Sequence, residues 1–208
     1  MEKRIEALIG GWGRKNILGV YCSDKGEAAG ELLTSIPATS SVGISGSKTL
    51  GQLEIVKQLE ARGNKVFNQY KPGISREESL GLKKLGAQAD YYLASANAVS
   101  ENGELVFFSA YGERIAGISS AKNVIVACGI NKITPDLNQA IKRAREYATP
   151  LNCKRLDWFT PCFKDGLCAK EICLFPEYKR MCCQILIIEA EIIPGRLKVI
   201  LVGESLGF

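Results

Sequence analysis

The sequence predicts one α/β domain over residues 1–208, built on an open, largely parallel sheet. Helical periodicity alternates with short β-rich runs along the chain, which is typical of a parallel sheet whose strands are joined by helices. A length of 208 residues suits a single domain. With 46% hydrophobic and 24% charged residues, the chain can bury a substantial core.

The first half of the chain supplies an N-terminal helix and several strands. Apolar residues recur at helical spacing after Ser23, which can cap that helix. A glycine-rich turn leads into a helix expected at 49–61. Ser75 and Glu78 have the spacing of a capping box for a helix over 76–86. The strands expected in this half lie at residues 17–22, 41–44, 65–68 and 91–94.

The second half begins with two more strands, expected at 104–109 and 123–128. Thr134 can then cap a helix that has Pro135 at its first position. From residue 150 to residue 183 the regular pattern stops and cysteines concentrate. We therefore expect a cysteine-rich excursion within the domain.

The chain closes with two β-rich runs, at residues 184–191 and 196–202. They are separated by Pro194-Gly195, a dipeptide that suits the two central positions of a type II turn. The sequence therefore predicts a C-terminal β-hairpin.

Charge gives no indication of a nucleic-acid partner. The chain has 27 basic and 22 acidic residues, a formal net charge of +5, and no long basic run. Its densest basic stretch, Lys142, Arg143 and Arg145, falls in the last turns of an expected helix, where cations complement the helix dipole. We expect no nucleic acid among its partners.

The sequence also predicts a cytoplasmic protein with no membrane partner. The N-terminal segment contains Glu2 and Glu6 and lacks the apolar centre of a secretory signal. The longest apolar run, residues 124–130, is too short to cross a bilayer. In the cytoplasm thiols stay reduced, so the eight cysteines favour metal or redox chemistry over disulfides.

The chain contains no histidine. This excludes Ser-His-Asp and Cys-His catalysis and removes a common zinc ligand. Any acid–base chemistry must therefore use Asp, Glu, Lys, Tyr or Cys.

A glycine turn after the second strand is the first candidate ligand site. Only two residues separate Gly43 from Gly46, and Ser47 precedes Lys48, so the segment is not a Walker A loop. A strand that ends in glycines before a helix nevertheless leaves backbone N–H groups available to an anion. Ser47, Lys48 and Thr49 add donors, and a phosphate or a carboxylate would fit. The alternative is an ordinary strand-to-helix turn with Ser47 as its N-cap.

Several motifs, in the right order over nearly the whole chain, resemble the lactate-utilisation (LUD) domain family. Each motif is weak alone, and together they are specific. They are residues 41–50 (SVGISGSKTL), 89–99 (ADYYLASANAV), 102–106 (NGELV), 112–116 (GERIA), 124–133 (VIVACGINKI), 160–162 (TPC) and 199–208 (VILVGESLGF).

The resemblance implies a fold similar to the NagB/RpiA/CoA-transferase group, whose ligands are anions bound above the strand ends. One wall of the site would then be the glycine turn. The segments 95–98 and 102–103 would form the opposite wall, with the Asn97 amide able to donate and accept. Arg114 is the candidate for a bidentate grip on a carboxylate or phosphate, and a surface salt bridge is its alternative role. The residues of the glycine turn are Gly43, Gly46, Ser47, Lys48 and Thr49.

Two further candidates come from the family motifs. Asn131 and Lys132 follow the strand 123–128 and offer an amide and a cation, although they also suit a loop that leads to the Thr134 cap. Glu204 is the candidate catalytic acid–base group, and a solvated surface glutamate is the alternative.

Six of the eight cysteines lie between residues 153 and 183. None of the gaps from Cys162 to Cys182 matches the two-residue gap of zinc ribbons and ferredoxins. An all-sulfur ligand set nevertheless selects zinc or an iron–sulfur cluster. The predicted ligands are Cys162, Cys168, Cys173 and Cys182, with Cys183 as the alternate, because insertions relative to the family leave the fourth ligand open. Free thiols, or disulfides formed on oxidation, are the alternatives.

The resemblance implies a redox enzyme or redox accessory in the oxidation of lactate or another organic acid. Such a protein would bind a small anionic metabolite. The alternative is a non-enzymatic partner or assembly protein for an iron–sulfur or flavin oxidoreductase. The sequence leaves both open.

Overall fold

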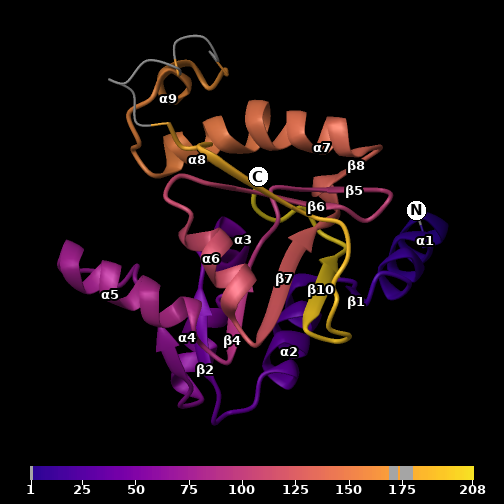
Figure 1. The fold of residues 1–208 in the computed structure, drawn as a ribbon, viewed down its shortest axis with the longest axis horizontal. Helices are drawn as coiled ribbons and strands as arrows, with labels where there is room; N and C mark the ends of the chain where they lie inside the picture. Colours follow the sequence, from indigo (N-terminus) through magenta and orange to yellow (C-terminus); the bar gives the residue numbers. More distant parts are fainter. Residues whose placement is uncertain (1, 169–172, 174–179) are drawn as a thin grey trace.

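A computed structural model describes residues 2–168, 173 and 180–208 as two sheets with helices around them (Figure 1). The larger sheet is open and entirely parallel, in the order β1-β10-β7-β4-β2-β3. The smaller sheet has the order β8-β5-β6-β9. The strands are β1 Ile17–Cys22, β2 Ser41–Ile44, β3 Lys65–Phe67, β4 Tyr91–Ala94, β5 Ala98–Ser100, β6 Leu105–Ser109, β7 Asn123–Gly129, β8 Ile133–Thr134, β9 Gln184–Ile188 and β10 Leu197–Val202.

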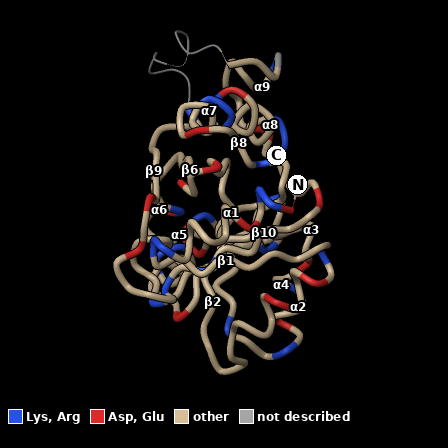
Figure 2. The backbone as a smooth tube through the Cα atoms, turned by 90° about the vertical axis from the view of Figure 1, so that its right-hand side faces the viewer, with Lys and Arg blue, Asp and Glu red and all other residues tan. Residues whose placement is uncertain are grey.

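Helices cover both sheets. Figures 1 and 2 both place α7, α8 and α9 at the opposite end of the molecule from α2 and α4. Figure 2 also shows basic and acidic residues interspersed along the backbone. The helices are α1 Glu2–Gly13, α2 Lys25–Ser35, α3 Lys48–Gln52, α4 Ile55–Ala61, α5 Arg76–Ala87, α6 Glu113–Ser120, α7 Leu137–Arg143, α8 Thr149–Arg155 and α9 Pro161–Asp165, and a π-helical turn, Ala144–Ala148, joins α7 to α8.

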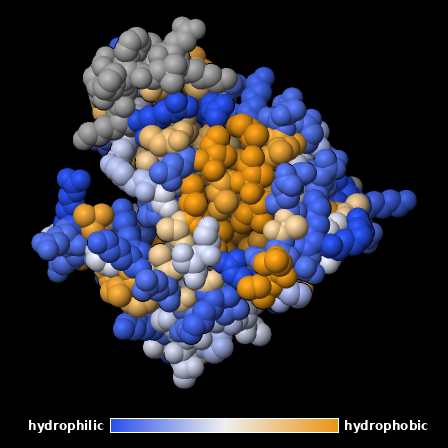
Figure 3. Space-filling view, viewed as in Figure 1, coloured by the Kyte–Doolittle hydropathy of each residue, from blue (hydrophilic) through white to orange (hydrophobic). Residues whose placement is uncertain are grey.

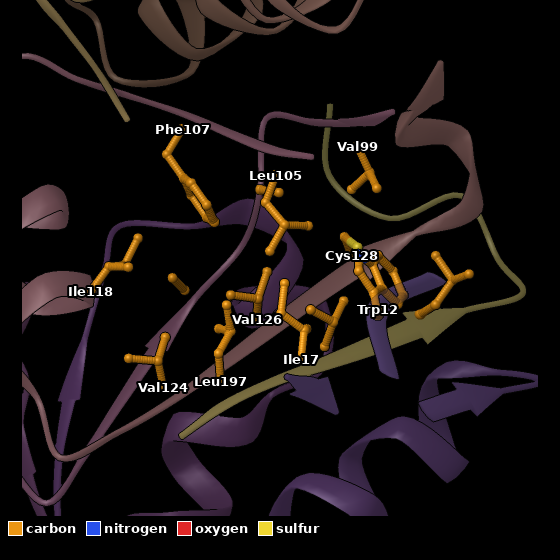
Figure 4. Packing of buried hydrophobic residues seen from close by; sticks show 14 of the residues in the cluster. Trp12, Ile17, Val99, Leu105, Phe107, Ile118, Val124, Val126, Cys128 and Leu197 are labelled. Carbon is orange, nitrogen blue, oxygen red and sulfur yellow. The ribbon is translucent and has the colours of Figure 1, made fainter. Parts of the chain in front are cut away.

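Successive side chains along each strand point to opposite faces of its sheet, and the buried ones form three hydrophobic cores. In β10, Val199 points into the core between the two sheets, whereas Ile200 points into the core under α2 and α4. In β6, Phe107 joins the core between the sheets and Phe108 joins a third core beneath α7. Figure 4 shows Phe107 facing the side chains of the larger sheet across the first core. The smaller sheet is therefore sandwiched between the larger sheet and α7.

The predicted α/β fold with an open, largely parallel sheet is confirmed. The second sheet was not predicted, because two of its strands are only two and three residues long. The capping box of Ser75 and Glu78 is present at the start of α5. No helix in the described part of the chain is long and apolar enough to cross a membrane.

One predicted helix span and two predicted N-cap residues were wrong. The helix expected at 49–61 is divided into α3 and α4 by Glu54, whose left-handed backbone (φ 50°) interrupts it. Asp24, rather than Ser23, caps α2, because its carboxylate accepts two backbone N–H bonds. Asp136 caps α7, and Thr134 instead lies in β8, where its hydroxyl donates to the Val99 carbonyl.

The two closing strands follow one another around a turn, but they pair in different sheets. Gly195 has φ +79° and Arg196 N donates to the Ile193 carbonyl, as a turn centred on Pro194-Gly195 requires. β10 lies between β1 and β7, and β9 pairs with β6. Burial explains the separation, since β10 is apolar and buried on both faces and so needs a central position.

The expected cysteine-rich excursion is partly helical. α8 and α9 occupy its first half, so the regular structure does not stop at residue 150. Residues 169–172 and 174–179 of this segment lie outside the described part of the chain.

We expect Gly43→Ala to destabilise the protein. A Cβ at Gly43 would lie 2.1 Å from the Gly86 carbonyl oxygen, which is backbone and cannot move aside easily. Overpacking of this kind costs about 1–3 kcal/mol. Gly30→Ala in α2 is the matched control, because its Cβ would meet nothing within 4 Å. Urea denaturation of both variants tests this, and equal free energies of unfolding for Gly43→Ala and the wild type would contradict it.

Candidate functional site

The candidate site lies beyond the carboxyl ends of β2, β4 and β7. These strands are parallel neighbours, so the segments that follow them emerge at the same edge of the sheet. β2 is followed by Ser45 and Gly46, β4 by Ser95, and β7 by a short 3-10 turn that ends at Lys132.

Two neighbouring hollows with shared lining residues occupy this edge. The main cavity has a volume of about 340 Å³ and is bordered by Ser45, Tyr70, Arg114 and Arg155 among others. A smaller inner pocket of about 40 Å³ lies beside it. Both are lined by Gly46, Ser47, Asn97, Arg114 and Asn152.

Arg114, from the first turn of α6, forms the wall shared by the two hollows. Its Nη1 donates to Asn97 Oδ1 (3.1 Å) and to the Phe108 carbonyl (3.0 Å). Its Nη2 donates to the Gly46 carbonyl (2.7 Å). Arg114 thus connects the glycine turn to the smaller sheet instead of forming the surface salt bridge considered as its alternative role.

Lys132 lies in the inner pocket and is only 3% exposed. Its Nζ donates to Ser95 Oγ (2.8 Å), Thr49 Oγ1 (2.9 Å) and the Ala96 carbonyl (3.1 Å). Burial lowers the pKa of Lys132 to about 7, and the positive charges of Arg143 and Arg114 act in the same direction. The sequence indicated this lysine only as an additional cation near the site.

Four of the five residues predicted in the glycine turn line the inner pocket. Gly46, Ser47, Lys48 and Thr49 all border the inner pocket. Ser47 also accepts a bond from Leu50 N (3.2 Å) and is the N-cap of α3, so its alternative role holds as well. The Lys48 ammonium lies over the Phe208 ring, 4.5 Å from its centre.

Three other predicted residues lie away from the two hollows. Gly43 is buried inside β2 against Gly86 and borders neither hollow. Asn131 holds the C-terminal segment, because its Oδ1 accepts from Leu206 N (3.1 Å). The Glu204 carboxylate accepts from Lys25 N (3.3 Å) and borders neither hollow.

Arg143 was not predicted as a site residue. From the end of α7 its Nη1 donates to the Asn97 carbonyl (2.7 Å) and to the main-chain oxygen of Phe208 (3.1 Å), and its Nη2 donates to the Asn131 carbonyl (3.0 Å). It therefore fixes the segments that border the inner pocket. A cation in the last turn of a helix gives no sequence signal for this role.

The cysteines form a pair rather than a complete ligand set among the described residues. Cys153 and Cys162 have their sulfurs 3.7 Å apart, and the Thr160 hydroxyl lies 3.2 Å from Cys162 Sγ. The hydrogen bond with Cys153 lowers the pKa of Cys162 to about 6. Arg180 Nε donates to Cys182 Sγ (3.2 Å).

No group of three ligating side chains comes together in the described part of the chain. The four-cysteine metal site therefore stays a prediction. Cys153, which pairs with Cys162, was not among the predicted ligands. A spacing argument that began at Cys162 could not find it, because α8 brings it back toward α9.

Comparison with known proteins identifies the family. The LUD domain model matches residues 5–202. The chain belongs to the LUD domain family. This makes it a lactate-utilisation-type protein and confirms the resemblance found in the motifs.

The fold of this LUD protein is similar to that of a solved DUF162 family protein from Deinococcus radiodurans. The two share 13% sequence identity, and the match covers 97% of this chain and 96% of the other, with a TM-score of 0.51. At this identity the likeness shows the fold alone. No curated protein matches the chain.

We expect the strand cysteines to resist alkylation. Cys22 and Cys128 are buried, and burial raises the pKa of each to about 11. Cys183 is exposed. In a timed reaction with iodoacetamide at neutral pH, read by peptide mass spectrometry, Cys183 should be modified at least ~100-fold faster than Cys128. Comparable rates would contradict the burial of β7.

Proposed function

We propose that this LUD protein binds a small anionic metabolite, a carboxylate or a phosphate compound, in the main cavity. The proposal includes a role as a redox enzyme or redox accessory in the oxidation of lactate or a related organic acid. Family membership supports the general role. The cavity's own donors support the anion.

Two buried donors without a partner carry this proposal. Among the described residues, the buried side-chain atoms with no hydrogen-bond partner are Ser45 Oγ, Arg114 Nε and Arg145 Nε. The first two belong to residues that border the main cavity. A buried polar group without a partner costs about 1–3 kcal/mol. An acceptor oxygen that came within hydrogen-bond distance of either atom would remove this cost.

The charges around the cavity favour an anion over a neutral ligand. Arg114 and Arg155 both border it, and Glu113 is the acidic residue on the same wall. The Glu113 carboxylate accepts from Ser109 Oγ (3.2 Å), so part of its charge is compensated by a hydrogen bond within the protein. Arginine suits carboxylate and phosphate oxygens because its N–H groups form a planar fork.

The redox part of the proposal rests on the cysteines. Sulfur donors select zinc or an iron–sulfur cluster, and Cys162, Cys168, Cys173 and Cys182, with Cys183 as alternate, would hold it. An iron–sulfur cluster supplies one-electron transfer when it is bound. The chain's own contribution would be the sulfur ligands and the anion-binding cavity.

A protein partner is the second candidate function, and an exposed apolar surface favours it. Figure 3 shows a broad apolar area on the face that carries β9. β9 is at the edge of its sheet, and Ile185, Ile192 and Ile193 are 40%, 89% and 56% exposed. Exposed apolar edges of this kind are typical of interaction surfaces. An iron–sulfur or flavin oxidoreductase is the partner class we propose, and co-purification tests it.

We expect Arg114→Met to weaken anion binding by about 10- to 100-fold, because a hydrogen bond to a charged group contributes about 1.5–3 kcal/mol. Isothermal titration with lactate, pyruvate and inorganic phosphate measures this. Arg4→Met is the matched control, since Arg4 makes a surface ion pair with Glu101 and borders neither hollow.

We expect Ser45→Ala to weaken anion binding without lowering the stability of the fold. The Ser45 hydroxyl has no partner in the protein, so its removal should leave the free energy of unfolding unchanged or slightly higher. Anion binding should still weaken, by about 3- to 10-fold for one lost neutral hydrogen bond. Absence of heat with every anion in the wild type would contradict the proposed function.

We expect anaerobically purified protein to contain iron or zinc. Cys162→Ser combined with Cys182→Ser should abolish the metal, whereas Cys22→Ala in β1 should retain it. Elemental analysis and the visible absorption spectrum measure this, since an iron–sulfur cluster absorbs and zinc does not. A metal-free wild type would remove the metal from the proposal.

A further inference from the structure

The inner pocket contains a serine and a lysine in hydrogen-bond contact. Ser95 Oγ lies 2.8 Å from Lys132 Nζ and 3.1 Å from Thr49 Oγ1. Ser95 is 5% exposed and borders the pocket that opens beside Arg114. Its hydroxyl is therefore next to the ligand space and next to an amine.

In the described part of the chain, Lys132 Nζ contacts two hydroxyls and a carbonyl but no Asp or Glu carboxylate, although buried lysines usually need an acidic partner. The titratable and charged groups that act on it are Cys128 from β7, Arg143 from α7 and Arg114 from α6. Two of these are cations. An amine in such surroundings is available in its neutral form near neutral pH, and a neutral amine can accept a proton from a hydroxyl.

A second lysine–serine pair in the same chain provides the contrast. Lys198 Nζ donates to Ser35 Oγ (2.7 Å), so the pair has the same contact as Lys132 and Ser95. Lys198 is also ion-paired with the Glu31 carboxylate. The Lys132 site thus differs by having cations where the Lys198 site has a carboxylate.

We propose that Ser95 is a nucleophile activated by Lys132, and that the pair transfers the acyl group of an activated acyl compound that carries an anionic end. This inference rests on the proposed function for the position of the anionic end, which would contact Arg114 in the main cavity. Serine–lysine pairs are a known variant of the serine nucleophile, and they need no histidine.

The chemistry uses only these groups and the substrate. Ser95 Oγ attacks the acyl carbon while its proton moves to Lys132 Nζ, and an Oγ–C bond forms. The bond from the acyl carbon to its leaving oxygen or sulfur breaks. That atom takes the proton from Lys132, which leaves Ser95 as an ester and the amine neutral. Water then cleaves the ester by the same steps, with Lys132 again accepting and returning a proton.

The pH dependence follows from the base that must be neutral. Because burial lowers the pKa of Lys132 to about 7, the acylation rate should rise with pH up to about 7 and then level off. A lysine with an ordinary pKa would give a rate that continues to rise through pH 9.

The test uses two chromogenic esters, mono-p-nitrophenyl succinate, which has an anionic end, and p-nitrophenyl acetate, which has none. We expect a burst of p-nitrophenol and an ester on Ser95, located by peptide mass spectrometry, formed faster with succinate than with acetate. Ser95→Ala should abolish the adduct. Lys132→Met should slow acylation by at least ~100-fold. Ser35 is the internal control and should stay unmodified.

Each outcome decides between the two proposals. An adduct on Ser95 that needs Lys132 and follows the predicted pH profile supports the pair, even if acetate reacts as fast as succinate. In that case the anion site of the proposed function fails on its own. Adducts on Thr49 or Ser35, or no adduct although isothermal titration shows anion binding, would overturn the serine–lysine inference. Because the pH profile is measured on the wild type, a variant that fails to fold does not prevent the decision.

Discussion

The contact of Arg114 with three separate segments holds the candidate site together. Its guanidinium spans from the Gly46 carbonyl to Asn97 Oδ1 and the Phe108 carbonyl. These acceptors belong to the turn after β2, the approach to β5, and β6. One side chain from α6 therefore connects the carboxyl edge of the larger sheet to the smaller sheet at the border of the cavity.

The same guanidinium explains why the cavity is suited to a ligand. All of its Nη contacts are made within the protein, whereas its Nε has no partner. An arginine fixed on one side and unsatisfied on another is pre-organised, so a ligand need not order it on binding. The same holds for Ser45, which is 3% exposed and also lacks a partner. The two unpaired polar atoms lower the stability of the free protein, and a ligand that hydrogen-bonds to them would offset this cost.

The fold could be predicted largely from periodicity, and the site only in part. Strands such as β7 and β10 are continuous apolar runs, which parallel central strands require. The glycine turn was found from its own pattern of a strand, glycines and a helix, and Arg114 was found because its motif resembles the family. β5 and β8 were missed because two or three residues carry no periodicity, and their positions are set by tertiary pairing alone.

The remaining misses have a common physical cause. Lys132 and Arg143 acquire their importance from burial, which depends on how α7 packs over the smaller sheet and not on neighbours in the sequence. Gly43 was predicted as a ligand residue, but its lack of a side chain serves the close approach of Gly86. Cys153 is brought to Cys162 by two short helices.

The most direct test of the account is a crystal structure of the protein grown with pyruvate or inorganic phosphate. The account predicts density for the anion in the cavity of about 340 Å³, with its oxygens within hydrogen-bond distance of Arg114 Nε and Ser45 Oγ. An empty cavity at saturating anion, or an anion bound elsewhere while these two donors stay without a partner, would contradict it.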